Sequence, residues 1–289
     1  MDIQTIGVVG SGTMGSGIAQ VAAQSGFNVL LYDINLKILQ KAIGQIGHYV
    51  RRSAEKGRIT EEEAEAALDR IATTTDLLDF KRCQFVIEAA PERIDLKKDL
   101  FHQLVTATPD DTILASNTST LSITQIGGGT GRPGKVVGMH FFNPAPLLPL
   151  VEVVAGAQTD PAVVDTTFEL AKQLGKRPIR VKDVPGFIVN RVARPFYLET
   201  LRLLEEGVAD YRTLDKLIRE GGGFPMGPFE LMDLIGLDIN YAASVSVYEA
   251  YFNDPRYRPS LLQQRKVQAG QLGRKSGRGW YIYDKDKSS

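Results

Sequence analysis

The chain has little of what marks disulfide-rich, zinc-binding or membrane proteins. One cysteine, Cys83, among 289 residues excludes an internal disulfide and multi-cysteine zinc sites, so we expect a reducing compartment and no metal. The apolar run 6–9 is too short for a signal peptide or a membrane span, which predicts a cytoplasmic protein that does not insert into a membrane. Basic and acidic side chains number 34 each, so no net charge favours nucleic acid as a partner.

Strands and helices alternate along the first part of the chain. Apolar runs of strand length occupy residues 5–10, 28–33, 85–89, 112–115, 136–141, 150–154 and 179–181. Helical spacing of apolar residues follows several of these runs, beginning with Met14, Ile18 and Val21. The alternation predicts an α/β domain over residues 1–184, built on a mostly parallel, doubly wound sheet of the Rossmann type.

Two further parts of the chain are predicted to be helical. Residues 36–70 carry two helical patterns separated by Lys56-Gly57-Arg58, and Thr60 with Glu63 forms a capping box at the second. We therefore expect a helical hairpin arm inserted in the α/β domain. After Pro185-Gly186 the strand signal nearly vanishes, which predicts an all-α C-terminal domain over residues 185–289, with a charged end at 284–289.

A glycine-rich turn follows the first predicted strand and opens the first helix. Gly10-Ser11-Gly12-Thr13-Met14-Gly15 matches G-x-G-x-x-G, whose glycines allow a tight turn, approach to a pyrophosphate and close helix packing. Asp33 ends the second strand at about the distance, ~20 residues, where an acid accepts the ribose hydroxyls of NAD and repels the 2′-phosphate of NADP. The turn predicts NAD binding through these six residues and Asp33. FAD and S-adenosylmethionine use similar turns, and Asp33 excludes neither.

One of three histidines, His140, lies at the carboxyl end of an apolar strand, where open α/β sheets place their ligands. Glu152 lies on the next strand, and a hairpin-like return would bring its carboxylate towards the imidazole. Such a pair fixes the tautomer and raises the basicity of the other nitrogen, as a general base requires. A purely structural hydrogen bond is the alternative interpretation.

Polar residues also follow other elements near this edge. Ser116-Asn117-Thr118-Ser119 ends a strand, and its hydroxyls can donate to a substrate oxygen or cap a helix. Asn190 follows Pro185-Gly186 at the predicted domain junction, where its amide would face a cleft or make an interdomain contact.

Six ordered blocks resemble the (S)-3-hydroxyacyl-CoA dehydrogenase family, especially its single-function bacterial members. The blocks are Val9-Gly10-Ser11-Gly12-Thr13-Met14-Gly15, Glu88-Ala89-Ala90-Pro91-Glu92, Ser116-Asn117-Thr118-Ser119, Gly138-Met139-His140-Phe141-Phe142-Asn143-Pro144, Val151-Glu152-Val153-Val154 and Pro185-Gly186-Phe187-Ile188-Val189-Asn190-Arg191.

The resemblance implies roles for individual residues. His140 would exchange a proton with the 3-hydroxyl as hydride moves to or from NAD, and Glu152 would orient its imidazole. Ser119 and Asn190 would hold the reacting oxygen and the thioester side. A further set would line the cofactor site, namely Ala90, Glu92, Lys97 and Asn117. The family commonly has two serines after Ser116-Asn117-Thr118, whereas here Ser119 precedes Thr120, which keeps the second hydroxyl.

The resemblance also suggests partners. Coenzyme A carries phosphates, and Arg52 and Lys56, four residues apart on the arm, are candidates to bind them, although a solvated charged surface is the alternative. The family favours a homodimer through the helical domain. Two rival functions remain, a non-catalytic NAD-binding protein and the group of 3-hydroxyisobutyrate and 6-phosphogluconate dehydrogenases, which use a catalytic lysine in their helical half.

Overall fold

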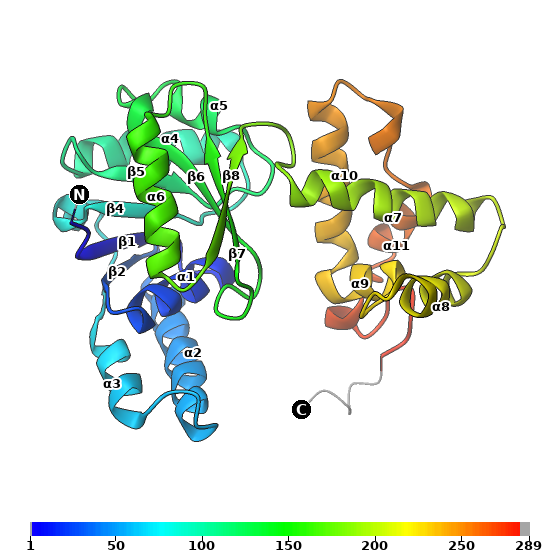
Figure 1. Cartoon of the computed structure of the whole chain (residues 1–289), viewed down its shortest axis with the longest axis horizontal. Helices are drawn as coiled ribbons and strands as arrows, with labels where there is room; N and C mark the ends of the chain where they lie inside the picture. The colour runs from blue at the N-terminus through cyan, green and yellow to red at the C-terminus, as the bar shows by residue number, and fades with distance from the viewer. Residues whose placement is uncertain (1, 284–289) are drawn as a thin grey trace. The chain divides into compact units, whose positions relative to one another are not determined.

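The computed structural model describes residues 2–283, which form two compact units that divide between Phe187 and Ile188 (Figure 1). The first unit is α/β and the second is built of helices, so the predicted fold class is confirmed. The charged end at 284–289 lies outside the described residues. Among the residues described, no helix has the length and apolar character needed to cross a bilayer.

Within the described residues the first unit contains one eight-stranded sheet. Its strands are β1 (Thr5–Val9), β2 (Asn28–Tyr32), β3 (Ile71–Thr74), β4 (Phe85–Glu88), β5 (Ile113–Ser116), β6 (Val136–Phe141), β7 (Leu150–Ala155) and β8 (Arg177–Lys182). The order is β3-β2-β1-β4-β5-β6-β7-β8. Strands β1 to β6 are parallel, and β7 runs antiparallel to β6. The carboxyl ends of six strands and the start of β7 therefore share one edge.

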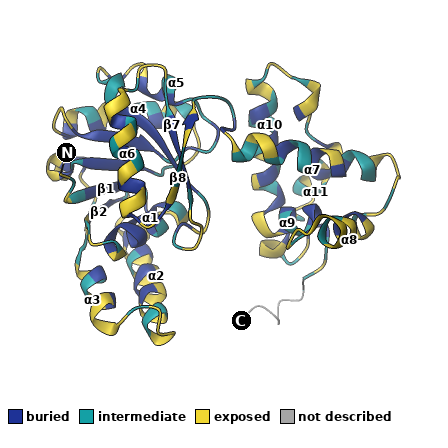
Figure 2. Cartoon of the chain, in the orientation of Figure 1, coloured by how far each residue is buried: buried dark blue, intermediate teal, exposed yellow. Residues whose placement is uncertain are grey.

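Helices cover both faces of this sheet. They are α1 (Thr13–Gln24), α2 (Leu36–Glu55), α3 (Glu61–Asp69), α4 (Ile94–Ala107), α5 (Ile123–Gly127) and α6 (Pro161–Gln173), with short 3-10 turns η1 (Leu77–Arg82) and η2 (Pro133–Lys135). Apolar residues of α1 and α6 pack on one face, and those of η1, α4 and α5 pack on the other. The central strands β4, β5 and β6 are buried along their whole length, whereas β3 and β8 are partly exposed (Figure 2). Cys83 lies in the second layer, where burial raises the pKa of its thiol to about 12.

The helical arm forms as predicted. Helix α2 buries Leu39, Ile46 and Val50 in the core that also contains α1, and Thr60 begins α3 with the expected capping box. No sequence pattern predicts β3, which follows the arm and pairs with β2 at the edge of the sheet. Its residues Ile71–Thr74 contain little apolar surface, so backbone pairing rather than hydrophobic patterning forms this strand.

The second unit is a helical domain with its own core. Its helices are α7 (Val189–Glu205), α8 (Tyr211–Gly222), α9 (Pro228–Ile235), α10 (Leu237–Ala250) and α11 (Leu261–Gln268), with turns η3 (Pro255–Tyr257) and η4 (Arg274–Ser276). Their buried apolar side chains pack around Phe229, Met232 and Trp280. Two buried carboxylates, Asp215 and Asp233, hold the segment 280–283 against α8 and α9 through backbone and tyrosine donors.

Replacing Asp233 with alanine is expected to destabilise this unit strongly. The carboxylate accepts from the amides of Trp280 and Tyr281, both at 2.9 Å, and from the hydroxyl of Tyr283 at 3.0 Å. Leaving these donors without an acceptor should cost about 3 kcal/mol of the free energy of unfolding. Urea unfolding followed by fluorescence of Trp280, the single tryptophan of the chain, measures the loss.

The matched control is Glu220→Ala, which removes an exposed carboxylate from α8 of the same unit. Its ion pair with Lys216 spans 3.9 Å at the surface, so the expected change is under about 0.5 kcal/mol. Equal effects of the two replacements would show that Asp233 does not anchor the C-terminal segment.

Candidate active site

The predicted cofactor residues of the first unit follow the carboxyl ends of neighbouring strands. Gly10 follows β1, Asp33 follows β2, Ala90 comes shortly after β4 and Asn117 follows β5. The order of the sheet reverses between β1 and β4, and open α/β sheets bind their ligands at such a reversal. The topology therefore gathers these residues at one ligand-binding edge.

The glycines of the turn have different physical reasons to be glycine. Gly10 has φ +95°, and a Cβ there would lie 2.9 Å from the carbonyl oxygen of Ala89. A Cβ on Gly15 would lie 1.7 Å from the carbonyl oxygen of Gly10, so this position needs glycine for the turn itself. A Cβ on Gly12 would meet nothing within 4 Å. The described chain does not require glycine at 12, whereas a ligand approaching the backbone does.

The start of α1 suits a pyrophosphate. Gly12 is the N-cap of this helix and provides no side-chain cap, which leaves the helix N-terminus suited to an anion. Asp33 lies beside the same turn, where its Oδ2 accepts from the amide of Ser11 at 2.9 Å and from its hydroxyl at 2.8 Å. The residues present therefore fit a dinucleotide whose ribose hydroxyls face a carboxylate. Thr13 and Met14 belong to the first turn of the helix.

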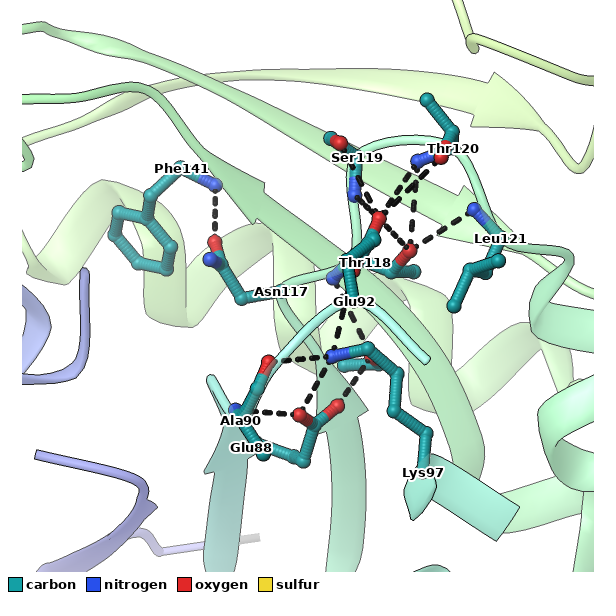
Figure 3. Close-up of polar contacts among 11 residues, drawn as sticks. Glu88, Ala90, Glu92, Lys97, Asn117, Thr118, Ser119, Thr120, Leu121 and Phe141 are labelled. Atoms are coloured by element: carbon teal, nitrogen blue, oxygen red, sulfur yellow. Dashed lines mark hydrogen bonds and ion pairs between the residues drawn. The ribbon is translucent and has the colours of Figure 1, made fainter. Parts of the chain in front are cut away.

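A network of hydrogen bonds and an ion pair connects the carboxyl ends of β4 and β5 (Figure 3). The Oε1 atom of Glu88, at the end of β4, accepts from Nζ of Lys97 and from the amide of Ala90, each at 2.6 Å. Its Oε2 atom accepts from the hydroxyl of Ser116 at 2.6 Å. Lys97 also donates to the carbonyl of Ala90 at 3.1 Å. The ion pair joins β4 to α4, the hydrogen bond from Ser116 adds β5, and the contacts to Ala90 hold the segment that begins there.

Glu92 organises the loop after β5. Its Oε1 atom accepts from the hydroxyl of Thr118 at 2.6 Å and from the amide of Ser119 at 2.8 Å, and Nζ of Lys97 lies 3.5 Å from its Oε2 (Figure 3). Burial acts to raise the pKa of Glu92, but the charge of Lys97 and the hydrogen bonds from Thr118, Ser119 and Thr120 outweigh it and lower that pKa. Glu92 is therefore an anionic acceptor that shapes the loop of Ser119.

Asn117 connects this loop to the strand of the histidine. Its side-chain Oδ1 accepts from the backbone amide of Phe141 at 2.8 Å, immediately after His140 (Figure 3). The contact joins the carboxyl ends of β5 and β6. A hydrogen bond therefore connects a predicted cofactor residue, Asn117, to the residue that follows the predicted catalytic His140.

His140 and Glu152 face each other across β6 and β7. They are direct partners in the antiparallel register, and Nδ1 of His140 lies 2.7 Å from Oε2 of Glu152. His140 is 6% exposed and Glu152 is fully buried, and the aromatic rings of Phe142 and Phe187 lie against the imidazole. With Glu152 ionised, Nδ1 donates to the carboxylate, which leaves Nε2 as a proton acceptor.

A groove of about 800 Å³ lies elsewhere in the first unit, between α1, the arm and the loop that follows β6. Arg52 and Lys56 line it together, as does Arg58, and its lining contains no acidic residue. Asn143 and Leu147 are among the lining residues from the loop. The two predicted coenzyme A contacts therefore belong to one positively charged groove.

Asn190 lies in the first turn of α7, in the helical unit, and its role stays a prediction. Glu88, Tyr49 and Arg58 have no role predicted from the sequence, and Ser116 is predicted only as one hydroxyl of the run 116–119. Glu88 is an acidic residue at the end of an apolar strand, as Asp33 is, and this pattern could have identified it as a candidate site residue. The groove residues Tyr49 and Arg58 had no signal, because the lining comes from segments far apart in the chain.

Two models of known protein families match this chain. Residues 5–184 match the model of the 3-hydroxyacyl-CoA dehydrogenase NAD binding domain, and residues 186–283 match that of the C-terminal domain of the same enzymes. The chain belongs to the 3-hydroxyacyl-CoA dehydrogenase family. Members of this family are NAD-dependent oxidoreductases, and the matched binding domain identifies NAD as the cofactor.

Three similar proteins illustrate the relationship. The chain is 47% identical to 3-hydroxyadipyl-CoA dehydrogenase of Escherichia coli over all 289 residues, and it spans 61% of that protein's length. It is 41% identical to 3-hydroxybutyryl-CoA dehydrogenase of Clostridioides difficile, with 97% of this chain and 99% of that protein covered. The crystal structure of (S)-3-hydroxybutyryl-CoA dehydrogenase from Ralstonia eutropha superimposes with a TM-score of 0.94 at 43% identity, covering 98% of this chain and all of that one.

Proposed function

We propose that this protein interconverts (S)-3-hydroxyacyl-CoA and 3-ketoacyl-CoA with NAD, and that 3-hydroxybutyryl-CoA and acetoacetyl-CoA are the substrate pair. The observation that carries the proposal is the buried contact of 2.7 Å between His140 and Glu152, at the sheet edge that also bears the glycine turn. Relatives named for both the adipyl and the butyryl substrate leave the acyl chain to experiment.

In this proposal His140 moves the proton of the reaction. Its Nδ1 is held by Glu152, so Nε2 accepts the proton of the 3-hydroxyl during oxidation and donates it during reduction. Glu152 keeps the ring orientation and stabilises the imidazolium that forms, and the buried site strengthens this electrostatic interaction. When bound, the nicotinamide supplies the hydride chemistry.

The neighbouring polar residues hold the reactants. Ser119 lies in the loop shaped by Glu92, and we assign its hydroxyl and the amide of Asn190 to the reacting oxygen and the thioester side of the substrate. Ala90, Glu92, Lys97 and Asn117 are assigned to the nicotinamide end of the cofactor site. Neutral donors near C3 favour the alkoxide that develops there without adding a competing base.

The positively charged groove is assigned to the coenzyme A part of the substrate. Arg52 lies in the last turn of α2 and Lys56 is its C-cap, while Arg51 beside them is turned to Glu65 of α3 at 3.0 Å. Three cations with no acid among the lining residues suit phosphates. The arm therefore acts as a phosphate-binding element.

Replacing both Arg52 and Lys56 with glutamine is expected to raise the KM for acetoacetyl-CoA at least about tenfold, because two phosphate contacts of ~1 kcal/mol each are lost. Steady-state assays measure the change. Arg51→Gln, which removes a neighbouring charge outside the groove, should leave KM unchanged, and acetoacetyl-pantetheine without the phosphorylated adenosine should be insensitive to all three changes. An equal KM increase with the truncated substrate would contradict the assignment.

We also propose that the protein is a homodimer formed through the helical unit and that it acts in the cytoplasm. The helical unit exposes large apolar side chains, including Val192, Leu217, Phe252 and Leu261. Exposed apolar surface of this kind is typical of subunit interfaces. The single cysteine suits a reducing compartment. Sedimentation equilibrium of the native chain would contradict the dimer if it gave the mass of one chain.

Absorbance at 340 nm with NADH and acetoacetyl-CoA tests the proposed reaction directly. Consumption of NADH that depends on the thioester is expected, and the reverse reaction should form NADH from the (S)-hydroxy isomer. A series of 3-ketoacyl-CoA substrates from four to ten carbons then measures the chain-length preference. No consumption at saturating substrate, with NADH binding intact, would overturn the function and favour a non-catalytic NAD-binding protein.

A further inference from the structure

Lys176 is a buried lysine without an acidic partner. It precedes β8, is 9% exposed, and its Nζ donates to the carbonyl oxygen of Ala145 at 2.6 Å and to that of Leu148 at 3.2 Å. Within residues 2–283 no carboxylate forms an ion pair with it, and burial lowers the pKa of its ammonium group. Lysine is rarely buried because its charge loses hydration. The burial of Lys176 therefore points to a function for its hydrogen bonds to the carbonyls of Ala145 and Leu148.

Both carbonyls belong to the loop that connects the strands of His140 and Glu152. The loop spans residues 142–149 and contains three prolines, which cannot donate backbone hydrogen bonds. The amides of Leu147 and Leu148 both donate to the carbonyl of Pro144 at 3.0 Å, so the loop folds back on itself. Lys176 supplies donors to two other carbonyls of the loop from the body of the sheet.

Helix α1 contacts the same loop. A Cβ on Gly17 would lie 3.2 Å from Cβ of Ala145 and 3.3 Å from Cδ of Pro146, so the absence of a side chain there lets the loop contact the helix closely. Gly17, Ala145 and Pro146 all line the positively charged groove. The loop therefore contacts both α1 and Lys176, and it lines the groove together with α1 and the arm.

We propose that Lys176 is a positioning residue for acyl-CoA binding, because its ammonium group fixes the loop 142–149 as the wall of the groove that receives coenzyme A. The inference rests on the proposed function. Lys176 acts on substrate binding and not on the proton transfer. The reason is that the paired strands β6 and β7, on either side of the loop, hold His140 and Glu152. The cofactor turn lies at the start of α1 and makes no contact with Lys176 among the hydrogen bonds described.

Lys176→Met tests the proposal, since methionine has similar reach and no donor. We expect the KM for acetoacetyl-CoA to rise at least tenfold, kcat to stay within threefold, and the Kd for NADH to stay unchanged. Gly17→Ala presses on the same loop from α1 and should also raise KM. Lys172→Met on α6, whose lysine is exposed and pairs with Glu169, is the matched control and should leave all three constants unchanged.

Hydrogen exchange of the loop gives a readout that does not depend on turnover. In Lys176→Met the amides of Leu147 and Leu148 should exchange at least tenfold faster, while those of β6 and β7 keep their protection. An unchanged KM, or unchanged exchange in the loop, overturns the inference. Lys176→Met could instead lose kcat, NADH binding and strand protection together. In that case an unchanged KM in Gly17→Ala overturns the inference. Absence of turnover in the native protein instead refutes the proposed function, and faster exchange in the loop alone would still support the anchoring by Lys176.

Discussion

His140→Gln is expected to lower kcat for reduction of acetoacetyl-CoA at least about 100-fold, the range lost when a general acid–base group is removed. Glutamine can still donate to Glu152 but has no ring nitrogen that exchanges a proton with the substrate. Because the cofactor turn lies on β1 and α1, the Kd for NADH should not change. Single-turnover kinetics and a fluorescence titration with NADH measure the two quantities separately.

Two further variants make this result specific. Glu152→Gln keeps a partner beside Nδ1 but removes the charge that stabilises an imidazolium, so kcat should fall by a smaller factor, about tenfold. His102→Gln changes an exposed histidine of α4 and should leave kcat unaltered. Near-native turnover of His140→Gln, or an equal loss in His102→Gln, would mean that His140 is not the proton-transfer group.

Gly12→Val should greatly weaken NAD binding without unfolding the protein. A Cβ at Gly12 meets no atom within 4 Å, and its φ of −65° is accessible to any residue, so the chain tolerates the side chain. The branched side chain instead fills the space above the start of α1 where the pyrophosphate approaches the backbone. We expect the Kd for NADH to rise at least ~100-fold, equivalent to about 2.7 kcal/mol.

The companion variant Gly15→Ala separates ligand space from turn geometry. Its Cβ would lie 1.7 Å from the carbonyl oxygen of Gly10, so the turn must distort and the protein should lose stability as well as affinity. Thermal unfolding of both variants, with and without NADH, measures the difference. Tight NADH binding by Gly12→Val would place the dinucleotide away from this turn.

Local patterns in the sequence determined much of this fold. The glycine turn, the apolar strand runs, the capping box at Thr60 and the end of the strand signal near Pro185 are local features, because turn geometry and burial of strands depend on residues close in the chain. They predicted the α/β class, the arm, the helical domain and an NAD site. They did not predict β3, because an exposed edge strand needs backbone partners more than hydrophobic residues.

The amino-acid sequence alone determined which residue types were available for the chemistry, and it placed His140, Asp33 and Asn117 at strand ends. Only the tertiary structure decided their distances. The register of β6 and β7 places Nδ1 of His140 at 2.7 Å from Oε2 of Glu152. The packing of α1, the arm and the loop 142–149 forms the positively charged groove, and Lys176 binds the loop that lines it. The hairpin-like return of β6 and β7 was expected from the sequence, but its register depends on pairing of the whole strands, and the groove depends on packing of segments far apart in the chain.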